Sequence, residues 1–191
     1  DVYYSTDYFA PPIEKTFTDK GIKIVRSPAF TGPGILFNFK VYPLSRPEVR
    51  QAIAYAVDRN RSDKVSYAQI GRAVKYMANF SDSNVPKYLT ADQVKALNQY
   101  NYDPQKAADV LTKAGFKKDS GSGEWSDDKG NPMEFELSYP SDYTDWVPVA
   151  QDVADQLTNF GIKITLRGIP DTQHRQTIRD GQFQICLLYT S

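Results

Sequence analysis

Cysteine and histidine are scarce in this 191-residue chain, which contains one of each, Cys186 and His174. A structural disulfide needs two thiols, and a closed zinc site needs four ligands of the Cys or His type. This scarcity excludes a disulfide within the chain and most metal chemistry, so we expect no cofactor and no metal. A single cysteine fits a reducing compartment and also an exported bacterial protein without disulfides, so the redox environment stays open.

An excess of one charge and long apolar runs are also missing. The 23 Lys and Arg residues balance 23 Asp and Glu residues, which argues against nucleic acid or an anionic membrane surface as a partner. The apolar run Ile185–Tyr189 is far shorter than the roughly 20 residues that span a bilayer. The chain begins at Asp1 without a signal-peptide pattern and ends in a strand-like segment. We therefore expect both ends to be cuts inside a longer protein, with any membrane attachment through an anchor outside this sequence.

Common catalytic motifs are absent as well. The chain has no nucleophile elbow, P-loop, dinucleotide-binding glycine motif or H-E-x-x-H zinc motif. A dyad of His174 and Cys186 is disfavoured because Cys186 lies in an apolar strand, where a thiol is usually inert. The acidic stretch Asp119–Asp128 lacks the ligand spacing of a calcium loop. We therefore expect a protein that is not an enzyme, with a small hydrolase that uses paired carboxylates as the alternative.

The first third of the chain is predicted to contain two strands and a helix. The strands are Ile22–Val25 and Ile35–Phe39, separated by turn residues. Ser45 and Glu48 have the spacing of a capping box at a helix start. The buried face of that helix is expected to carry the apolar residues at helical spacing, Val49, Ala52, Ile53, Ala56 and Val57. Its other face, which includes Tyr55, is expected to be solvated or packed at an edge.

Later segments continue the alternation of helix and strand. The polar stretch Asn79–Pro86 is predicted to be a surface loop. Asp103 before Pro104 is predicted to cap a helix that Gly115 ends. The remaining predicted elements, in order, are a hairpin around Trp125, a strand over Met133–Tyr139, a helix from Trp146 to Phe160, a strand over Ile162–Leu166, a helical turn over Thr172–Arg179 and a final strand from Ile185. Strands that alternate with helices indicate a layered α/β or α+β domain.

The segment most typical of a ligand-binding loop is Tyr139-Pro-Ser-Asp-Tyr-Thr-Asp-Trp146, between a strand end and a helix start. Open α/β domains bind ligands at loops that follow the carboxyl ends of strands. Aromatic rings give flat apolar contacts to peptide side chains or sugar faces, and carboxylates accept hydrogen bonds from ammonium or hydroxyl groups. Asp142, Tyr143, Asp145 and Trp146 are therefore candidate ligand contacts. The alternative interpretation is an ordinary helix start with Trp146 as its first core residue, and both stay open.

A longer block carries a resemblance to a known family. The block is Tyr42-Pro-Leu-Ser-Arg-Pro-Glu-Val-Arg-Gln-Ala-Ile-Ala-Tyr-Ala-Val-Asp-Arg59, and Tyr102-Asp-Pro-Gln-Lys-Ala107, Phe160-Gly-Ile162 and Gly181-Gln-Phe183 follow in order. With these landmarks the chain resembles the bacterial extracellular solute-binding proteins of family five, the oligopeptide and dipeptide-binding type. The resemblance covers nearly the whole chain and is weakest over residues 60–101.

The resemblance implies both a fold and a function. The fold is an α/β mixed-sheet lobe, the larger lobe of a two-lobed periplasmic-binding-protein-like fold (type II, cluster C). Residues 1–191 would form this single lobe, with residues 1–10 and 183–191 in strands that cross to the other lobe. The function is that of a monomeric protein in the periplasm or outside the cell, with a lipid anchor as one form of attachment, which captures a peptide or small-molecule ligand for the permease of an ABC importer. In this frame Asn38 is a further candidate ligand contact, and Arg179 is a candidate partner for a ligand carboxylate.

Two features depart from the family pattern. Gln184 stands where the family usually carries Asp, and Leu187-Leu-Tyr-Thr-Ser191 lacks the Trp and Asp that peptide-binding members tend to carry just beyond. The family uses that Asp to hold the amino terminus of a peptide. The Tyr143-Thr-Asp-Trp146 loop also resembles members that bind oligosaccharides, so the ligand class stays divided between oligopeptide and oligosaccharide. A protein–protein interaction module that uses the 13 Tyr residues is the alternative function.

Overall fold

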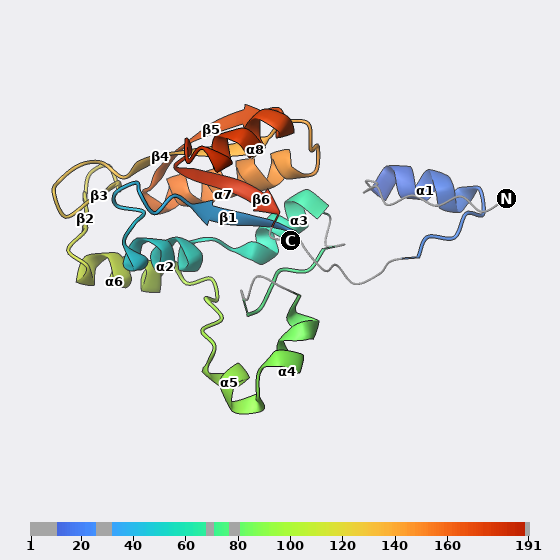
Figure 1. The fold of residues 1–191 in the computed structure, drawn as a ribbon, viewed down its shortest axis with the longest axis horizontal. Helices are drawn as coiled ribbons and strands as arrows, with labels where there is room; N and C mark the ends of the chain where they lie inside the picture. The colour runs from blue at the N-terminus through green and yellow to red at the C-terminus, as the bar shows by residue number, and fades with distance from the viewer. Residues whose placement is uncertain (1–10, 26–31, 68–70, 77–80, 190–191) are drawn as a thin grey trace.

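The computed structural model describes residues 11–25, 32–67, 71–76 and 81–189 (Figure 1). Strands alternate with helices over most of this length, which confirms the α/β class. The elements in chain order are α1 (Pro11–Asp19), β1 (Pro33–Phe37), α2 (Pro47–Ala56), α3 (Arg59–Tyr67), the 3-10 helix η1 (Asp82–Asn84), α4 (Val85–Tyr88), α5 (Ala91–Ala96), α6 (Pro104–Lys113), β2 (Lys117–Lys118), β3 (Trp125–Ser126), β4 (Glu134–Pro140), α7 (Trp146–Phe160), β5 (Lys163–Ile169), α8 (Asp171–Arg179) and β6 (Ile185–Tyr189).

A four-stranded mixed sheet organises the chain, with the strand order β1-β6-β4-β5. β4 pairs in parallel with β5 over the full length of both strands, from Glu134 opposite Lys163 to Pro140 opposite Ile169. β6 is parallel to β4, whereas β1 is antiparallel to β6. A small second sheet pairs β2 with β3. The carboxyl ends of β4, β5 and β6 therefore lie along one edge of the main sheet.

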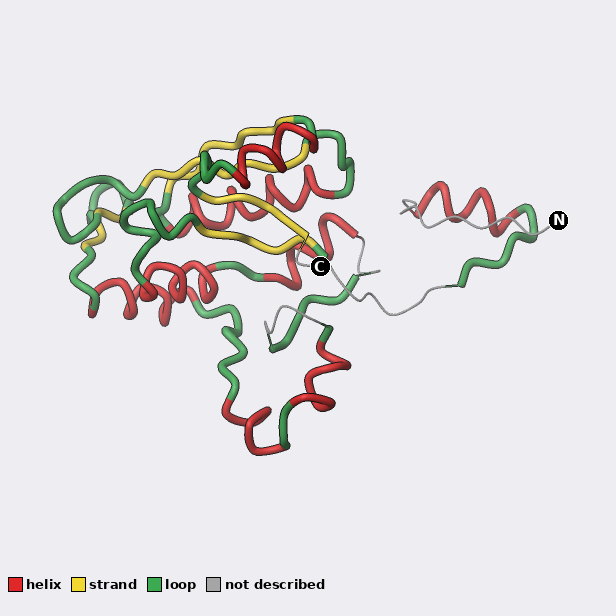
Figure 2. The backbone as a smooth tube through the Cα atoms, in the orientation of Figure 1, coloured by secondary structure: helices red, strands yellow, loops and turns green. Residues whose placement is uncertain are grey.

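The two crossover helices lie on opposite faces of this sheet. α7 links β4 to β5, whereas α8 links β5 to β6, which lies on the other side of β4. Right-handed crossovers that run in opposite directions place their helices on opposite faces, and Figure 1 shows α8 in front of the strands and α7 behind them. α7 also packs against α2 and α3, and α2 packs against α6. In the view of Figure 2, α2 and α6 lie below the strands.

The buried face and the carboxyl-terminal end of α7 follow directly from its sequence. Its apolar residues recur at helical spacing, so one face is buried and the other is solvated. The helix ends at Gly161, whose φ of 109° lies in the left-handed region that favours glycine. The predicted buried stripe is confirmed at every position, namely Trp146, Val149, Ala150, Val153, Ala154, Leu157 and Phe160. Asp103 also caps α6 as predicted, because its carboxylate accepts from the Lys106 backbone N–H at 2.9 Å.

Two expectations for the amino-terminal part are wrong. The segment Ile22–Val25 is irregular and follows a helix, α1, that the sequence reasoning missed. β-branched residues favour a strand only where a partner strand is available, and neither sheet of the described part of the chain includes this segment. The predicted capping box is also wrong, because the residue before α2 is Arg46 and no side chain caps the helix. Ser45 instead closes a turn, with its N–H donating to the carbonyl of Val41 at 3.0 Å.

Two further expectations fail in the middle of the chain. Tyr55 is buried with 5% exposure, because its ring packs against Tyr100 at a centroid distance of 5.0 Å and its hydroxyl accepts from Asn98 at 2.7 Å. The described part of the stretch Asn79–Pro86 contains η1 and the start of α4 rather than a plain loop. The short helical turns there carry little apolar periodicity, so the sequence pattern does not reveal them.

An arm that carries α4 and α5 projects from the sheet and the helices packed on it (Figure 1). Arg59 holds both ends of this arm, because its guanidinium donates to the carbonyls of Val74, Gln99 and Tyr100 at 3.2, 2.9 and 2.8 Å. Within the described ranges, no helix combines the length and the apolar character that crossing a bilayer requires. The expectation of a crossing strand over residues 1–10 lies outside the described residues.

Candidate functional site

The candidate site is the edge of the sheet at the carboxyl ends of β4 and β5, which we call the crevice after the place where such sheets bind ligands. The chain leaves β4 toward α7 on one face of the sheet and leaves β5 toward α8 on the other face. Such a divergence of neighbouring loops opens a crevice, and ligands of open α/β sheets bind there. Gly168 shapes this edge, because a Cβ atom at that position would lie 2.9 Å from the ring of Tyr139. The site is therefore built by the loop after β4 and by the first turn of α8.

Polar contacts join the two sides of this crevice. The Asp142 carboxylate accepts from the backbone N–H of Asp171 at 3.0 and 3.3 Å, so it caps α8 from the neighbouring loop. The Arg175 Nη2 donates to the hydroxyl of Tyr143 at 3.4 Å, and its Nε donates to the Asp171 carboxylate at 2.7 Å. These contacts form a continuous chain of hydrogen bonds across the crevice.

The electrostatics of the crevice are set by the pair of Asp171 and Arg175. Their carboxylate and guanidinium are 2.7 Å apart, and the two side chains are 20% and 54% exposed. The Asp171 carboxylate and the Tyr143 hydroxyl raise the pKa of Arg175 above its ordinary value. The guanidinium is therefore a permanent positive charge beside the Asp171 carboxylate, at an edge that solvent reaches. Such groups can hydrogen-bond to the ammonium, carboxylate or hydroxyl groups of a ligand.

The aromatic residues of the loop occupy different environments. Trp146 is 3% exposed and belongs to the core under α7. Tyr143 is partly buried and meets the edge of the Trp146 ring, with centroids 5.3 Å apart and an interplanar angle of 75°. The structure thus places Tyr143 at the crevice with Trp146 beneath it. Asp145, also partly buried, directly precedes α7. The roles of Asp142, Tyr143, Asp145 and Trp146 as ligand contacts stay predictions.

The structure places Asn38 and Arg179 at the opposite end of the sheet. Asn38 follows β1, beside the start of β6, and Arg179 is the last residue of α8, about 12 Å along the helix axis from Asp171. The Asn38 amide is 7% exposed, donates to the carbonyls of Gly181 and Phe183 at 3.0 and 2.7 Å and accepts from the Lys40 N–H at 3.0 Å. Asn38 and Arg179 therefore do not lie with the loop residues, and their ligand contacts stay predictions.

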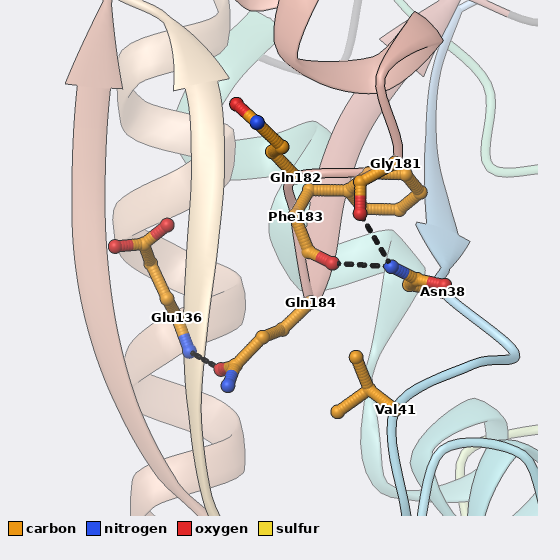
Figure 3. Close-up of a pocket in the computed structure, with 7 residues that line it drawn as sticks. All are labelled: Asn38, Val41, Glu136, Gly181, Gln182, Phe183 and Gln184. Carbon is orange, nitrogen blue, oxygen red and sulfur yellow. Dashed lines mark hydrogen bonds between the residues drawn. The ribbon is translucent and has the colours of Figure 1, made fainter.

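A shallow pocket of about 330 Å³ lies at this opposite end (Figure 3). Gln184 lines it and closes the gap between β6 and β4, because its Oε1 accepts from the Glu136 N–H at 2.6 Å. Figure 3 shows the amides of Asn38 and Gln184 each turned toward backbone groups. The pocket walls are thus tied together by their own hydrogen bonds.

Two residues of the crevice were missed by the sequence reasoning. Asp171 and Arg175 lie four residues apart, the spacing at which opposite charges face each other on a helix. This spacing was readable within the predicted helical turn, but only the structure shows that the turn starts beside the loop at Asp142. No three His, Cys, Asp or Glu side chains in the described parts of the chain gather as a metal site would require.

The whole chain, residues 1–191, matches the family of bacterial extracellular solute-binding proteins, family 5 Middle. The chain belongs to this family. Among curated relatives, the glutathione-binding protein GsiB of Salmonella choleraesuis is 25% identical over 166 residues, which cover 87% of this chain and 28% of that protein.

Solved structures give the same picture of the fold. A periplasmic oligopeptide-binding protein of Thermotoga maritima has a TM-score of 0.83 and 25% identity, covering 95% of this chain and 34% of that chain. The same protein with bound mannohexaose gives a TM-score of 0.80, again with 25% identity and the same coverage. This family member therefore has the mixed α/β fold found in the two-lobed oligopeptide-binding proteins, and it spans about a third of the length of the proteins it matches.

Proposed function

We propose that this chain is one lobe of a two-lobed bacterial solute-binding protein that captures an oligopeptide or an oligosaccharide for an ABC importer. The observation that carries this proposal is the hydrogen bonding at the edge of the sheet where β4 and β5 end: Asp142 accepts from the backbone of Asp171, and Arg175 of the same helix donates to Tyr143. Family membership supports it. The relatives are named for glutathione and oligopeptide binding, and one carries mannohexaose.

The proposed mechanism is closure of two lobes around the ligand. β1 begins and β6 ends at the same edge as the crevice, because Pro33 lies opposite Tyr189 in the sheet. Chain segments that continue from this edge would connect the two lobes there, so a hinge movement would bring the second lobe over the crevice. Closure removes the ligand from water and strengthens its hydrogen bonds to the groups at the edge.

We further propose that the protein acts without catalysis, as a monomer outside the cytoplasmic membrane, in the periplasm or held at the cell surface by a lipid anchor. The buried Cys186 supports the first point, because its burial raises the pKa of the thiol to about 12 and leaves it protonated and unreactive. The ABC permease is the proposed partner that receives the ligand.

Native mass spectrometry of the gently purified two-lobed protein tests the proposal. We expect the intact mass to exceed the denatured mass by one or more ligands, with released masses that match either a peptide ladder or a hexose series. Absence of any adduct, together with no thermal shift on addition of peptide and oligosaccharide pools, would contradict the proposal. A stable complex with another protein in the absence of small ligand would instead favour an interaction module.

A further inference from the structure

A buried imidazole lies on the helix that forms one wall of the crevice. His174 of α8 is 1% exposed, and α8 packs against β4. The ring has a hydrogen bond with the backbone of Ser138, whereas its Nε2 has no hydrogen-bond partner among the described residues. A buried polar atom without a partner is unfavourable, and a buried charge without a partner is more so. His174 is therefore suited to this position only as a neutral ring.

Within the part of the chain that the structure describes, the surroundings of the imidazole supply no partner for Nε2. The charged groups that act on it are Asp171 and Arg175 from α8 and Asp142 from the loop after β4. All three are engaged, since Asp171 pairs with Arg175 and Asp142 accepts from the backbone of Asp171. The sheet contributes Ser138 of β4 and, in register with it, Cys186 of β6, whose buried thiol stays neutral because its pKa is raised to about 12.

The helix that carries His174 also makes hydrogen bonds to the loop after β4. Its first residue, Asp171, donates through its backbone to Asp142, and Arg175 donates to Tyr143. His174 lies between these two contacts in sequence, with its own N–H bonded to the carbonyl of Pro170 at 2.9 Å. A change that lifts α8 from β4 therefore disturbs both contacts between α8 and the loop.

We propose that His174 is an acid-sensitive element that loosens α8 and the loop at Asp142 and Tyr143, so that ligand affinity falls as the pH drops below about 6.5. This inference rests on the proposed ligand-binding function of the crevice. It concerns the regulation of that site, because the group that titrates is buried beneath the groups expected to touch ligand.

The direction of the pH effect follows from the burial of the imidazole. Burial lowers the pKa of His174 in the folded protein, while the ring in an opened α8 keeps an ordinary value of about 6.5. Above that value both states are neutral, and the full stability of the closed helix is present. As the pH falls below it, the opened state binds a proton before the closed state does, so stability is lost. Each further pH unit multiplies the opening constant by at most about tenfold until the folded group titrates.

The first experiment measures α8 directly in the 191-residue chain. Because His174 is the chain's single histidine, its imidazole resonances report one group by NMR. Hydrogen exchange over residues 171–179, corrected for intrinsic rates, is compared at pH 7.5 and pH 5. We expect an imidazole pKa below 6.5 and a loss of protection in α8 of roughly tenfold at pH 5. An unshifted imidazole pKa with unchanged protection would overturn the proposal.

Two variants assign the effect to His174. His174→Phe keeps a ring and cannot titrate, and His174→Asn is smaller and retains a side-chain amide donor toward Ser138. Both are expected to lose the acid-induced opening of α8, so that protection at pH 5 equals protection at pH 7.5. Opening that persists in whichever variant folds would show that another group is responsible and would overturn the proposal.

The second experiment measures ligand affinity in the two-lobed protein at both pH values, using the ligand identified by mass spectrometry. We expect a loss of about tenfold at pH 5 in the wild type and a markedly smaller loss in His174→Phe. Equal losses in both proteins would overturn the regulatory role while leaving the proposed function intact. No binding at either pH would contradict the proposed function and the regulation that rests on it, whereas the exchange data on α8 would stand independently.

Discussion

The two ends of the main sheet use similar polar side chains for different purposes. At the carboxyl ends of β4 and β5, the loop after β4 contacts α8, because Asp142 accepts from the Asp171 N–H and Tyr143 accepts from Arg175. These side chains remain at least partly exposed to solvent. At the other end, Asn38 and Gln184 direct their amides to backbone groups of neighbouring segments. The first arrangement can exchange solvent for a ligand, and the second replaces missing strand-to-strand hydrogen bonds. Polar residue type alone therefore does not distinguish the proposed binding edge from the opposite end of the sheet, whereas the partners of the polar groups do.

The largest effect on stability is expected at Trp146, the buried residue at the end of the loop after β4. Trp146→Ala removes a ring that is 3% exposed, and we expect a loss of about 3–5 kcal/mol in the free energy of unfolding. Urea denaturation followed by circular dichroism measures it, with Trp146→Phe as the control that retains an aromatic ring and loses less. A loss below about 1 kcal/mol for the alanine variant would place the ring outside the core.

A smaller loss of stability is expected from Asn38→Ala at the opposite end. The change leaves the carbonyls of Gly181 and Phe183 and the N–H of Lys40 without their partner, at a cost of about 2–3 kcal/mol. Asn101→Ala, at an exposed asparagine, is the matched control and should stay within about 0.5 kcal/mol of wild type. If Asn38→Ala instead weakened ligand binding and left stability unchanged, Asn38 would be a ligand contact and the contrast between the two ends would fail.

Tyr143→Ala is expected to act on binding more than on folding. The ring is partly buried and its hydroxyl faces Arg175, so we expect ligand affinity of the two-lobed protein to fall about tenfold. Isothermal titration calorimetry measures the affinity, and Tyr88→Ala is the control because Tyr88 is 74% exposed on the arm. Unchanged affinity in Tyr143→Ala would remove the loop from the proposed site.

The smallest effect is expected from Arg175→Gln, with Arg179→Gln as its matched partner on the same helix. Arg175 contacts Asp171 and Tyr143 at the crevice, whereas Arg179 ends α8 at the far side. Because the Arg175 ion pair is exposed, we expect Arg175→Gln to lower ligand affinity only roughly two- to fivefold, and Arg179→Gln to leave it unchanged. The same calorimetric titration measures both variants. The reverse order of effects would support the sequence-based choice of Arg179 and contradict the structural one.

Much of the fold was predictable from local patterns, and the assembly of the site was not. The α7 stripe, the Asp103 cap and the glycine end of α7 are properties of neighbouring residues, so periodicity and capping rules identify them. The contact between Asp142 and the first turn of α8 joins segments 29 residues apart. It depends on the sheet order, which no local pattern encodes.

Burial distinguishes the environments of the remaining candidates, whose roles as ligand contacts stay predictions. The sequence left Trp146 open between core and ligand contact, because an aromatic residue at a helix start suits both roles. It also ranked Asn38 with the loop residues, although the partners of the Asn38 amide come from a segment more than 140 residues away. Tertiary hydrogen bonds of this kind decide which polar side chains remain available to a ligand.

The most direct test of the central claim is a hydrogen-exchange footprint of the two-lobed protein with and without its ligand. We predict that ligand slows exchange over residues 141–146 and 171–175, at the crevice between β4 and β5, and leaves residues 38–41 and 181–184 unchanged. Protection confined to residues 38–41 and 181–184 would place the ligand at the pocket in Figure 3 and would contradict the account.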